Sequence, residues 1–264
     1  MATATLESWI DAQQAKGRYS FVRADAVHES NLSPAAVSKA LQRSVKRGRI
    51  VKLKDYFYVL VPLEYVNTGA PPASWFIRDL MAAMGLPYYV GLLSAAALHG
   101  ASHHQPQEFQ VFTDRSVRPL KAGRTRIRFS ASKYVAGAAV ADMKTATGSM
   151  RVSTPETTAV DLVRFVKSAG QLDNVATVIA ELSPALDPKR LLAAVRRVDD
   201  VPSAQRLGYI LDQIRQRRLS DPIHAWLERQ EPRSLPLRSG HQLNGMRENR
   251  RWRLSVNKPI EVDA

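Results

Sequence analysis

Apolar residues recur at helical spacing in the first segment of the chain, where Leu6, Trp9 and Ile10 share one face. Thr5 stands where it can cap this helix, and Gly17 stands where it can end it. The next stretch, YSFVRADAVHES at residues 19–30, alternates briefly and then changes to helical spacing. It predicts a short extended segment followed by a short helix.

A third helix is expected to begin at Pro34. Ser33 can accept hydrogen bonds from the exposed amides of the first turn, and a proline there loses nothing by lacking an amide proton. Gly48 is placed to end this helix. The segments RIVKL and KDYFYVLV then alternate as two strands around Lys54 and Asp55, which predicts a short hairpin. Three helices followed by a hairpin form the order of a winged helix-turn-helix, so we predict such a domain at residues 1–65.

The remainder of the chain, residues 66–264, predicts a larger mixed α/β domain. The run NTGAPP at residues 67–72 interrupts regular structure and suits the boundary between the two domains. EFQVFT (108–113) and RIRFSAS (126–132) alternate as strands, whereas four segments after Thr154 carry apolar residues at helical spacing. The expected fold class is therefore α+β, with an N-terminal winged helix-turn-helix followed by a mixed α/β domain.

The apolar pattern of the third helix predicts which of its side chains face outward. Val37, Leu41 and Val45 repeat every four residues and are expected to turn inward. Seven cations and no acid lie from Lys39 to Lys54, and those on the helix are expected to face solvent. The whole chain has 38 Lys plus Arg against 24 Asp plus Glu, a net charge of +14, and so attracts polyanions at long range. Nucleic acid is the first candidate partner.

A helix of this size fits the major groove of DNA with its N-terminal half toward the base edges. Arginine reads guanine and glutamine reads adenine, so we assign base contacts to Ser38, Lys39, Gln42 and Arg43. Charge and reach suffice for phosphate contacts, which we assign to Lys46, Arg47, Lys52 and Lys54. The alternative is a solvated basic face without a partner. The position of the charge, on the element that a winged helix-turn-helix offers to DNA, favours function.

A second basic cluster lies in the larger domain and has two interpretations. In the RIRFS segment the arginines share one face and the apolar residues the other, so the polar outer face of a half-buried sheet would explain them. Alternatively the cluster binds RNA, flanking DNA or an acidic protein. Its seven cations are Arg115, Arg118, Lys121, Arg124, Arg126, Arg128 and Lys133.

Several classes of site are absent from the sequence. The chain has no cysteine, which excludes disulfides, thiol catalysis and cysteine-ligated metals. It has no nucleophile elbow, no phosphate-binding glycine loop and no apolar stretch long enough to span a membrane, so we expect a cytoplasmic protein without catalytic residues or cofactor. His99, His103 and His104 lack ligand partners at suitable spacing other than Glu108, so we expect no metal site.

Two other functions stay open as alternatives. A metal-dependent nuclease would use Glu108 with the histidines, and a ligand-sensing regulator would hold a small molecule against the helix at residues 95–98. Cleavage of nucleic acid with Mg²⁺ or Mn²⁺ would distinguish the first, and a ligand-dependent rise in melting temperature the second.

Four stretches together resemble a known family. They are YYVGLLSAAALHG followed by PQEFQV (88–111), VSTPETTAVDLVRF (152–165), QRLGYILD (205–212) and RWRLSVN (251–257). They are similar to the AbiEi antitoxins of type IV toxin-antitoxin systems, and the resemblance extends over nearly the whole chain. These antitoxins carry a winged helix-turn-helix ahead of a larger α/β domain.

The resemblance implies a non-enzymatic DNA-binding protein of phage defence that represses its own operon at inverted repeats. Its partners would be double-stranded operator DNA and a nucleotidyltransferase-like toxin that it counters without a necessarily stable complex. By position Ser33 joins the recognition helix, Lys52 and Lys54 correspond to the wing, and the cluster at 115–133 corresponds to the family's basic patch. One departure concerns the wing, where KLKDYFYVL lacks the glycine of a tight turn and predicts a different turn.

Overall fold

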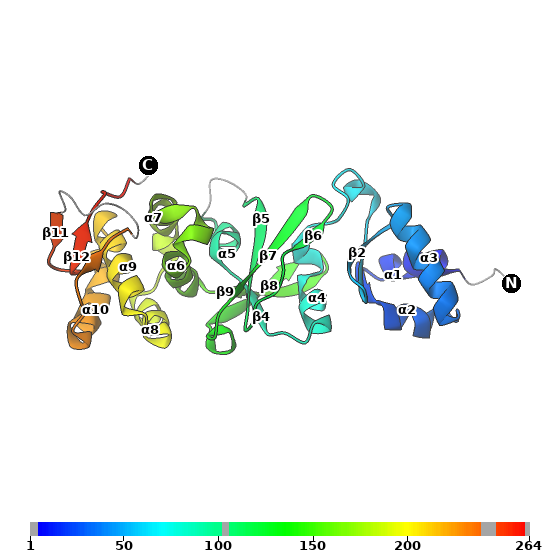
Figure 1. The fold of residues 1–264 in the computed structure, drawn as a ribbon, viewed down its shortest axis with the longest axis horizontal. Coiled ribbons are helices and arrows are strands. Elements are labelled where there is room, and N and C mark those ends of the chain that lie inside the picture. Colours follow the sequence, from blue (N-terminus) through cyan, green and yellow to red (C-terminus); the bar gives the residue numbers. More distant parts are fainter. Residues whose placement is uncertain (1–4, 102–105, 239–246, 262–264) are drawn as a thin grey trace. The chain divides into compact units, whose positions relative to one another are not determined.

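The computed structural model describes residues 5–101, 106–238 and 247–261. Its contacts divide the chain into two compact units (Figure 1). The first unit consists of residues 1–89, 107–135 and 142–151, and the second of residues 90–106, 136–141 and 152–264. Contacts therefore group the N-terminal elements with strands that follow later in the chain. The domain boundary after residue 65 stays a prediction.

The N-terminal elements are three helices and a three-stranded antiparallel sheet of order β1-β3-β2. Their arrangement is compatible with a winged helix-turn-helix. Their bounds are α1 Leu6–Ala15, β1 Ser20–Val22, α2 Arg23–Glu29, α3 Pro34–Lys46, β2 Ile50–Lys54 and β3 Phe57–Leu60.

Local sequence signals account for the ends of these elements. The Thr5 hydroxyl accepts from the Ser8 amide at 3.1 Å at the start of α1, and Ser33 accepts from the Ala36 amide at 3.3 Å at the start of α3. Gly48 has a φ of +70°, the left-handed conformation that follows a helix end, so the predicted start and end of α3 are confirmed.

The buried side of α3 corrects one sequence prediction. Val37 and Leu41 are 0% and 2% exposed, but Val45 is 38% exposed and Ser44 takes the third buried position. A spacing of four residues rotates the side chain about 40° per step, so Val45 lies about 80° from Val37, whereas Ser44 lies within about 20° of it. The prediction that Val45 turns inward was wrong for this reason.

A six-stranded mixed sheet of order β6-β7-β5-β4-β9-β8 follows. β5 pairs in parallel with β7, and β6 pairs with β7 as an antiparallel hairpin. The stretch between the two strands predicted at 108–113 and 126–132 thus contains a further strand, β6, that the sequence pattern did not predict. Between β3 and β4 lie η1 Leu63–Tyr65, η2 Ala73–Trp75 and α4 Ile77–Ala83. The strands are β4 Tyr88–Val90, β5 Glu108–Thr113, β6 Leu120–Ala122, β7 Thr125–Ala131, β8 Val140–Thr145 and β9 Gly148–Ser153.

The second unit is mainly helical. α6 is buried along most of its length and packs against α5, α7, α8 and α9. The helices are α5 Leu92–Leu98, α6 Pro155–Arg164, α7 Gln171–Leu182, α8 Pro188–Val198, α9 Val201–Gln213 and α10 Arg217–Leu227. The 3-10 turns are η3 Val135–Gly137, η4 Val166–Ala169, η5 Ser183–Ala185 and η6 Glu228–Gln230, of which η3 begins on the last residue of a first-unit segment. Across the part of the chain that the structure describes, no helix has the length and apolar character needed to cross a bilayer.

A small sheet of order β10-β12-β11 closes the second unit. Its strands are β10 Leu235–Pro236, β11 Arg247–Asn249 and β12 Leu254–Val256. Trp252, which is 1% exposed, anchors it. Its indole nitrogen donates to Asp212 Oδ2 at 2.8 Å, and its carbonyl accepts from Gln205 Nε2 at 2.9 Å. The indole ring packs directly on the backbone of Gly208 in α9, so closely that a Cβ at this position would lie 2.1 Å from Trp252 Cζ3.

Candidate nucleic-acid interface

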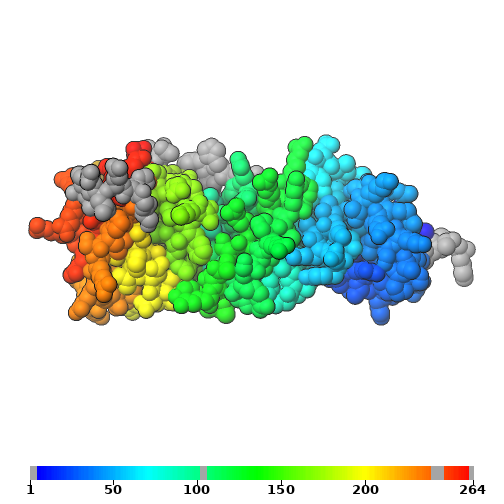
Figure 2. Space-filling view, viewed as in Figure 1, coloured from blue at the N-terminus to red at the C-terminus, as the bar shows by residue number. Residues whose placement is uncertain are grey.

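The outward face of α3 holds the exposed residues assigned to DNA. Lys39, Gln42, Arg43, Lys46 and Arg47 are all exposed, as predicted from the helical pattern. In the space-filling view the blue residues of α3, which Figure 1 labels from the same side, lie at the surface (Figure 2). Among the residues that the structure describes, Lys39, Arg43 and Lys46 form no salt bridge, whereas Arg47 does. α3 therefore offers three cations, Lys39, Arg43 and Lys46, that pair with no carboxylate of the described residues.

The two serines assigned to α3 have other hydrogen bonds. Ser33 caps the helix. The Ser38 hydroxyl donates to the Pro34 carbonyl at 2.7 Å and accepts from Arg23 Nη2 at 2.6 Å. Ser38 thus fixes a guanidinium at the N-terminal half of α3. The sequence analysis missed Arg23 because its position beside α3 depends on the packing of two helices, which no local pattern records.

The hairpin after α3 differs from a simple tight wing. Its register shifts between Lys52 and Lys54, the mark of a bulge, and the turn is formed by Asp55 and Tyr56. Lys52 Nζ pairs with Asp55 Oδ1 at 3.1 Å, and Tyr56 at the tip is 41% exposed. Lys54 is half-buried. An acid therefore offsets one of the two wing cations.

A hollow of about 390 Å³ lies between α3 and this hairpin. Its walls come from α3, from both strands and the turn of the hairpin and from the first residue of α2, so it joins several residues assigned to DNA. The lining residues are Arg23, Ser38, Leu41, Gln42, Val45, Lys52, Asp55 and Tyr58. The exposed Val45 is thus part of this surface and not of the core.

Two cations at the end of α3 are tied to the first helix. Arg47 pairs with Glu7, and Arg49 pairs with Asp11. Both pairs are largely exposed, with side-chain exposures of 62% and 54% for the first, and such pairs contribute little to stability. Arg47 stays assigned to phosphate as a prediction, although an acid competes for its charge.

The second basic cluster is exposed along its whole length. Arg126 and Arg128 face solvent while Ile127 is buried, which confirms the predicted alternation of β7. Lys121 of β6 lies opposite Arg126 in the antiparallel pair. Arg128 Nε pairs with Glu108 Oε2 at 2.6 Å.

Other members of the cluster also have partners. Arg115 Nε donates to Asp114 Oδ1 at 3.2 Å, a bond that raises the pKa of the guanidinium, and Lys133 stands 5.1 Å from the Tyr134 ring centroid. Arg118 and Arg124 are exposed, and the amide of Arg124 donates to the Thr68 carbonyl at 2.8 Å. Whether the cluster binds a polyanion stays a prediction.

Two residues considered as metal ligands in the sequence analysis, His99 and Glu108, make contacts within the fold. His99 ends α5, and its Nε2 lies 2.7 Å from the Ser153 carbonyl oxygen, to which it donates. Glu108, the acid weighed for a nuclease, pairs with Arg128. His103 and His104 lie outside the described residues. Within 5–101, 106–238 and 247–261, no three His, Asp or Glu side chains form a group able to hold a metal ion.

Comparison with known proteins assigns the central part of the chain. A family model of the AbiEi antitoxin C-terminal domain matches residues 89–213. The chain is also similar to the crystal structure of the RV2827C protein from Mycobacterium tuberculosis, with a TM-score of 0.69 and 15% identity over 96% of this chain and 93% of that chain. That likeness concerns the fold, and it supports the mixed α/β class. No curated protein matches the chain. Residues 89–213 thus match the AbiEi antitoxin C-terminal domain, which confirms for this part of the chain the resemblance inferred from the sequence.

Proposed function

We propose that this chain is a non-enzymatic antitoxin of a type IV toxin-antitoxin system that binds operator DNA and represses its own operon. The AbiEi domain at residues 89–213 supports the antitoxin role. The N-terminal elements support the DNA-binding role. The operator would consist of inverted repeats, and the toxin would be a nucleotidyltransferase-like protein encoded beside this chain.

The observation that carries the DNA-binding proposal is the orientation of α3. Val37, Leu41 and Ser44 are buried, so the opposite face of the helix must point to solvent. That face carries Gln42 and Arg43, which suit adenine and guanine edges. It also carries Lys39, which we assign to base edges, and Lys46, which we assign to phosphate.

The adjoining hollow also suits a duplex. Its rim holds the Arg23 guanidinium, fixed by Ser38, and Lys52 of the hairpin. A phosphate group in this hollow would meet cations from α2 and from the hairpin, whereas the α3 face would lie in the major groove. Arg23 therefore joins the residues that we assign to phosphate contact.

Fluorescence anisotropy with a labelled duplex from upstream of the chain's own coding region tests the proposal. If Arg23, Lys46 and Lys52 each neutralise one phosphate, log Kobs should fall with log salt with a slope of about −3 per chain. Loss of a base contact should cost about 1–3 kcal/mol of discrimination, so Gln42→Ala and Arg43→Ala should reduce the preference for this duplex over a scrambled one.

Two further variants separate the contributions. Lys52→Ala should weaken binding to both duplexes equally, because phosphate contacts carry no sequence information. Lys16→Ala, which removes one exposed cation at the end of α1, is the matched control and should have a smaller effect. Equal affinity of the unaltered chain for both duplexes would refute specific operator binding.

The toxin half of the proposal needs a separate experiment. Inducible expression of the neighbouring nucleotidyltransferase-like gene should arrest growth, and co-expression of this chain should restore it. A variant with Gln42 and Arg43 both replaced by alanine should still restore growth when both genes are driven from foreign promoters, since operator binding is then not needed. Arrest that persists with the unaltered chain would refute the antitoxin role.

A further inference from the structure

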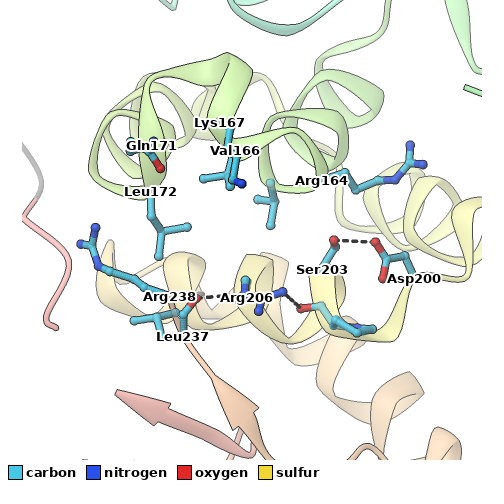
Figure 3. Close-up of a pocket in the computed structure, with 12 residues that line it drawn as sticks. Arg164, Val166, Lys167, Gln171, Leu172, Asp200, Ser203, Arg206, Leu237 and Arg238 are labelled. Atoms are coloured by element: carbon cyan, nitrogen blue, oxygen red, sulfur yellow. Dashed lines mark hydrogen bonds between the residues drawn. The ribbon is translucent and has the colours of Figure 1, made fainter. Parts of the chain in front are cut away.

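The second unit contains a cavity that the proposed DNA and toxin roles do not use. It has a volume of about 380 Å³ and lies between the end of α6, η4 and the start of α7 on one side and α9 with the segment after β10 on the other (Figure 3). Sites for small molecules usually have volumes of about 300–1,000 Å³. The cavity is therefore large enough for a compact metabolite.

Four cations line this cavity, but two of them are paired elsewhere. Arg164 pairs with the buried Asp161 at 3.0 Å, and Arg238 pairs with Asp173. Figure 3 shows these two guanidinium groups on opposite sides, each directed away from the space between the helices. Their charges are offset within the fold, so they do not define the chemistry of the cavity.

Arg206 and Lys167 have no such carboxylate pairing among the described residues. Arg206 donates from Nε to the Leu237 carbonyl at 2.9 Å, from Nη2 to the Pro236 carbonyl at 3.1 Å and from Nη1 to the Pro202 carbonyl at 3.4 Å. Three of its five N–H groups are thus used, and two remain for a ligand. Lys167 is exposed and projects from the opposite wall (Figure 3).

Arg206 is half-buried, and its hydrogen-bond partners among the described residues are neutral carbonyls with no carboxylate. The surroundings lower the pKa of its guanidinium because burial removes water from the charged form. Asp200, the one acid among the lining residues, acts in the opposite direction with a smaller effect, and it accepts a hydrogen bond from Ser203 at 2.6 Å. An anion placed between the two walls would supply the missing countercharge.

Apolar side chains complete the cavity. They would cover a hydrocarbon or aromatic body but leave an inorganic anion partly without contacts. They are Val163, Val166, Leu172, Pro202 and Leu237.

We propose that this cavity binds a small organic phosphate, with Lys167 and Arg206 on the phosphate group and the apolar wall on the organic body. A phosphomonoester carries about −1.5 to −2 charges at pH 7, which matches two cations better than a single carboxylate does. The arginine supplies fixed N–H donors toward the phosphate oxygens, and the lysine supplies a mobile point charge. The AbiEi domain would thereby respond to a phosphorylated metabolite.

Isothermal titration of the full chain with phenyl phosphate tests this proposal, with inorganic phosphate and phenol as the two part-ligands. We expect saturable binding of phenyl phosphate that is tighter than that of either part. Lys167→Ala should weaken it about tenfold, the loss expected for one hydrogen bond between charged groups. Lys189→Ala removes an exposed cation from α8 outside the cavity and should leave the affinity unchanged.

The titration can overturn either the whole proposal or the role of the apolar wall. Absence of saturable heat at millimolar phenyl phosphate, or equal affinities of the two lysine variants, would overturn the proposal. Binding of inorganic phosphate as tight as that of phenyl phosphate would overturn the role of the apolar wall. No DNA or toxin is present in the titration, so its result does not depend on the function proposed above.

Discussion

Replacement of Gly208 by alanine tests whether the contact between α9 and Trp252 fixes the C-terminal sheet. In an exposed helix interior this change usually stabilises, because alanine is favoured over glycine by about 1 kcal/mol. Here the added Cβ would lie 2.1, 2.2 and 2.6 Å from three carbons of the indole ring. Real Cβ atoms essentially never lie within 3.0 Å of such an atom, so the ring must move by about an ångström or the helix must shift.

The magnitude follows from what Trp252 would lose. Overpacking of a core costs about 1–3 kcal/mol, and full loss of a buried tryptophan costs about 3–5 kcal/mol. Contacts as short as 2.1 Å cannot be relieved without displacing the ring, so the cost lies between the upper end of overpacking and the loss of the tryptophan, about 3–5 kcal/mol. Subtraction of a helix-propensity gain of about 1 kcal/mol leaves an expected destabilisation of about 2–4 kcal/mol. Displacement of the ring would also weaken its hydrogen bond to Asp212, which is 2.8 Å long in the unaltered chain. The effect of the packing contact thus exceeds the effect of propensity and reverses its sign.

Thermal unfolding followed by circular dichroism measures the change, and a domain of this size should lose about 2–4 °C per kcal/mol. Gly137→Ala is the matched control, because the nearest atom to a Cβ there is Arg197 Cδ at 3.9 Å, and it should be nearly neutral. The Gly208→Ala change should cost much less when Trp252 is also replaced by alanine. A melting temperature that is unchanged or raised in the single Gly208→Ala variant would refute the reasoning.

Three further predictions follow from the contacts of both units. Asp55→Asn should tighten DNA binding up to about fivefold at low salt, because an exposed ion pair worth about 0.2–1 kcal/mol no longer holds Lys52; anisotropy that shows no gain would contradict this assignment. Asp173→Asn should lower the melting temperature at pH 7, because the hydrogen bond that this carboxylate accepts from a guanidinium lowers its pKa in the folded state. A carboxylate with a lowered pKa stabilises the folded state above about pH 4, and this stabilisation is lost as the pH falls. The difference in melting temperature between the variant and the unaltered chain should therefore shrink toward about pH 3, and a difference that stays constant with pH would contradict the prediction. Leu41→Ala should cost about 2–5 kcal/mol in chemical denaturation, whereas Val45→Ala should cost less than about 0.5 kcal/mol, and similar costs would show that both side chains face the core.

The hydrophobic pattern predicted most elements of the N-terminal part because its signals are local. Ser33, Pro34 and Gly48 fix the ends of α3 through hydrogen bonds and backbone preferences within a few residues. The alternation in RIRFS likewise follows from the geometry of one strand. Failures occurred where a small error in phase mattered, as for Val45, or where the pattern was too short, as for β6.

The partners of the assigned cations could not be read from the sequence in the same way. The pairing of Arg47 with Glu7 joins residues 40 positions apart, and the hydrogen bond from Arg23 to Ser38 depends on how α2 packs against α3. Both change the charge that α3 offers to DNA. Only packing reveals which cations retain a charge without a carboxylate beside it.

For this chain, then, the sequence by itself determined the helix that carries the basic face, its start and end, and the antiparallel hairpin that follows. It also determined the resemblance of the central domain, because runs such as YYVGLLSAAALHG are contiguous. The tertiary structure alone decided that Ser44, and not Val45, completes the buried face of α3. It also brought Lys167, Arg206 and Leu237 around one cavity from three separate segments, since packing depends on contacts between residues far apart in the chain, and no periodicity along the sequence encodes those distances.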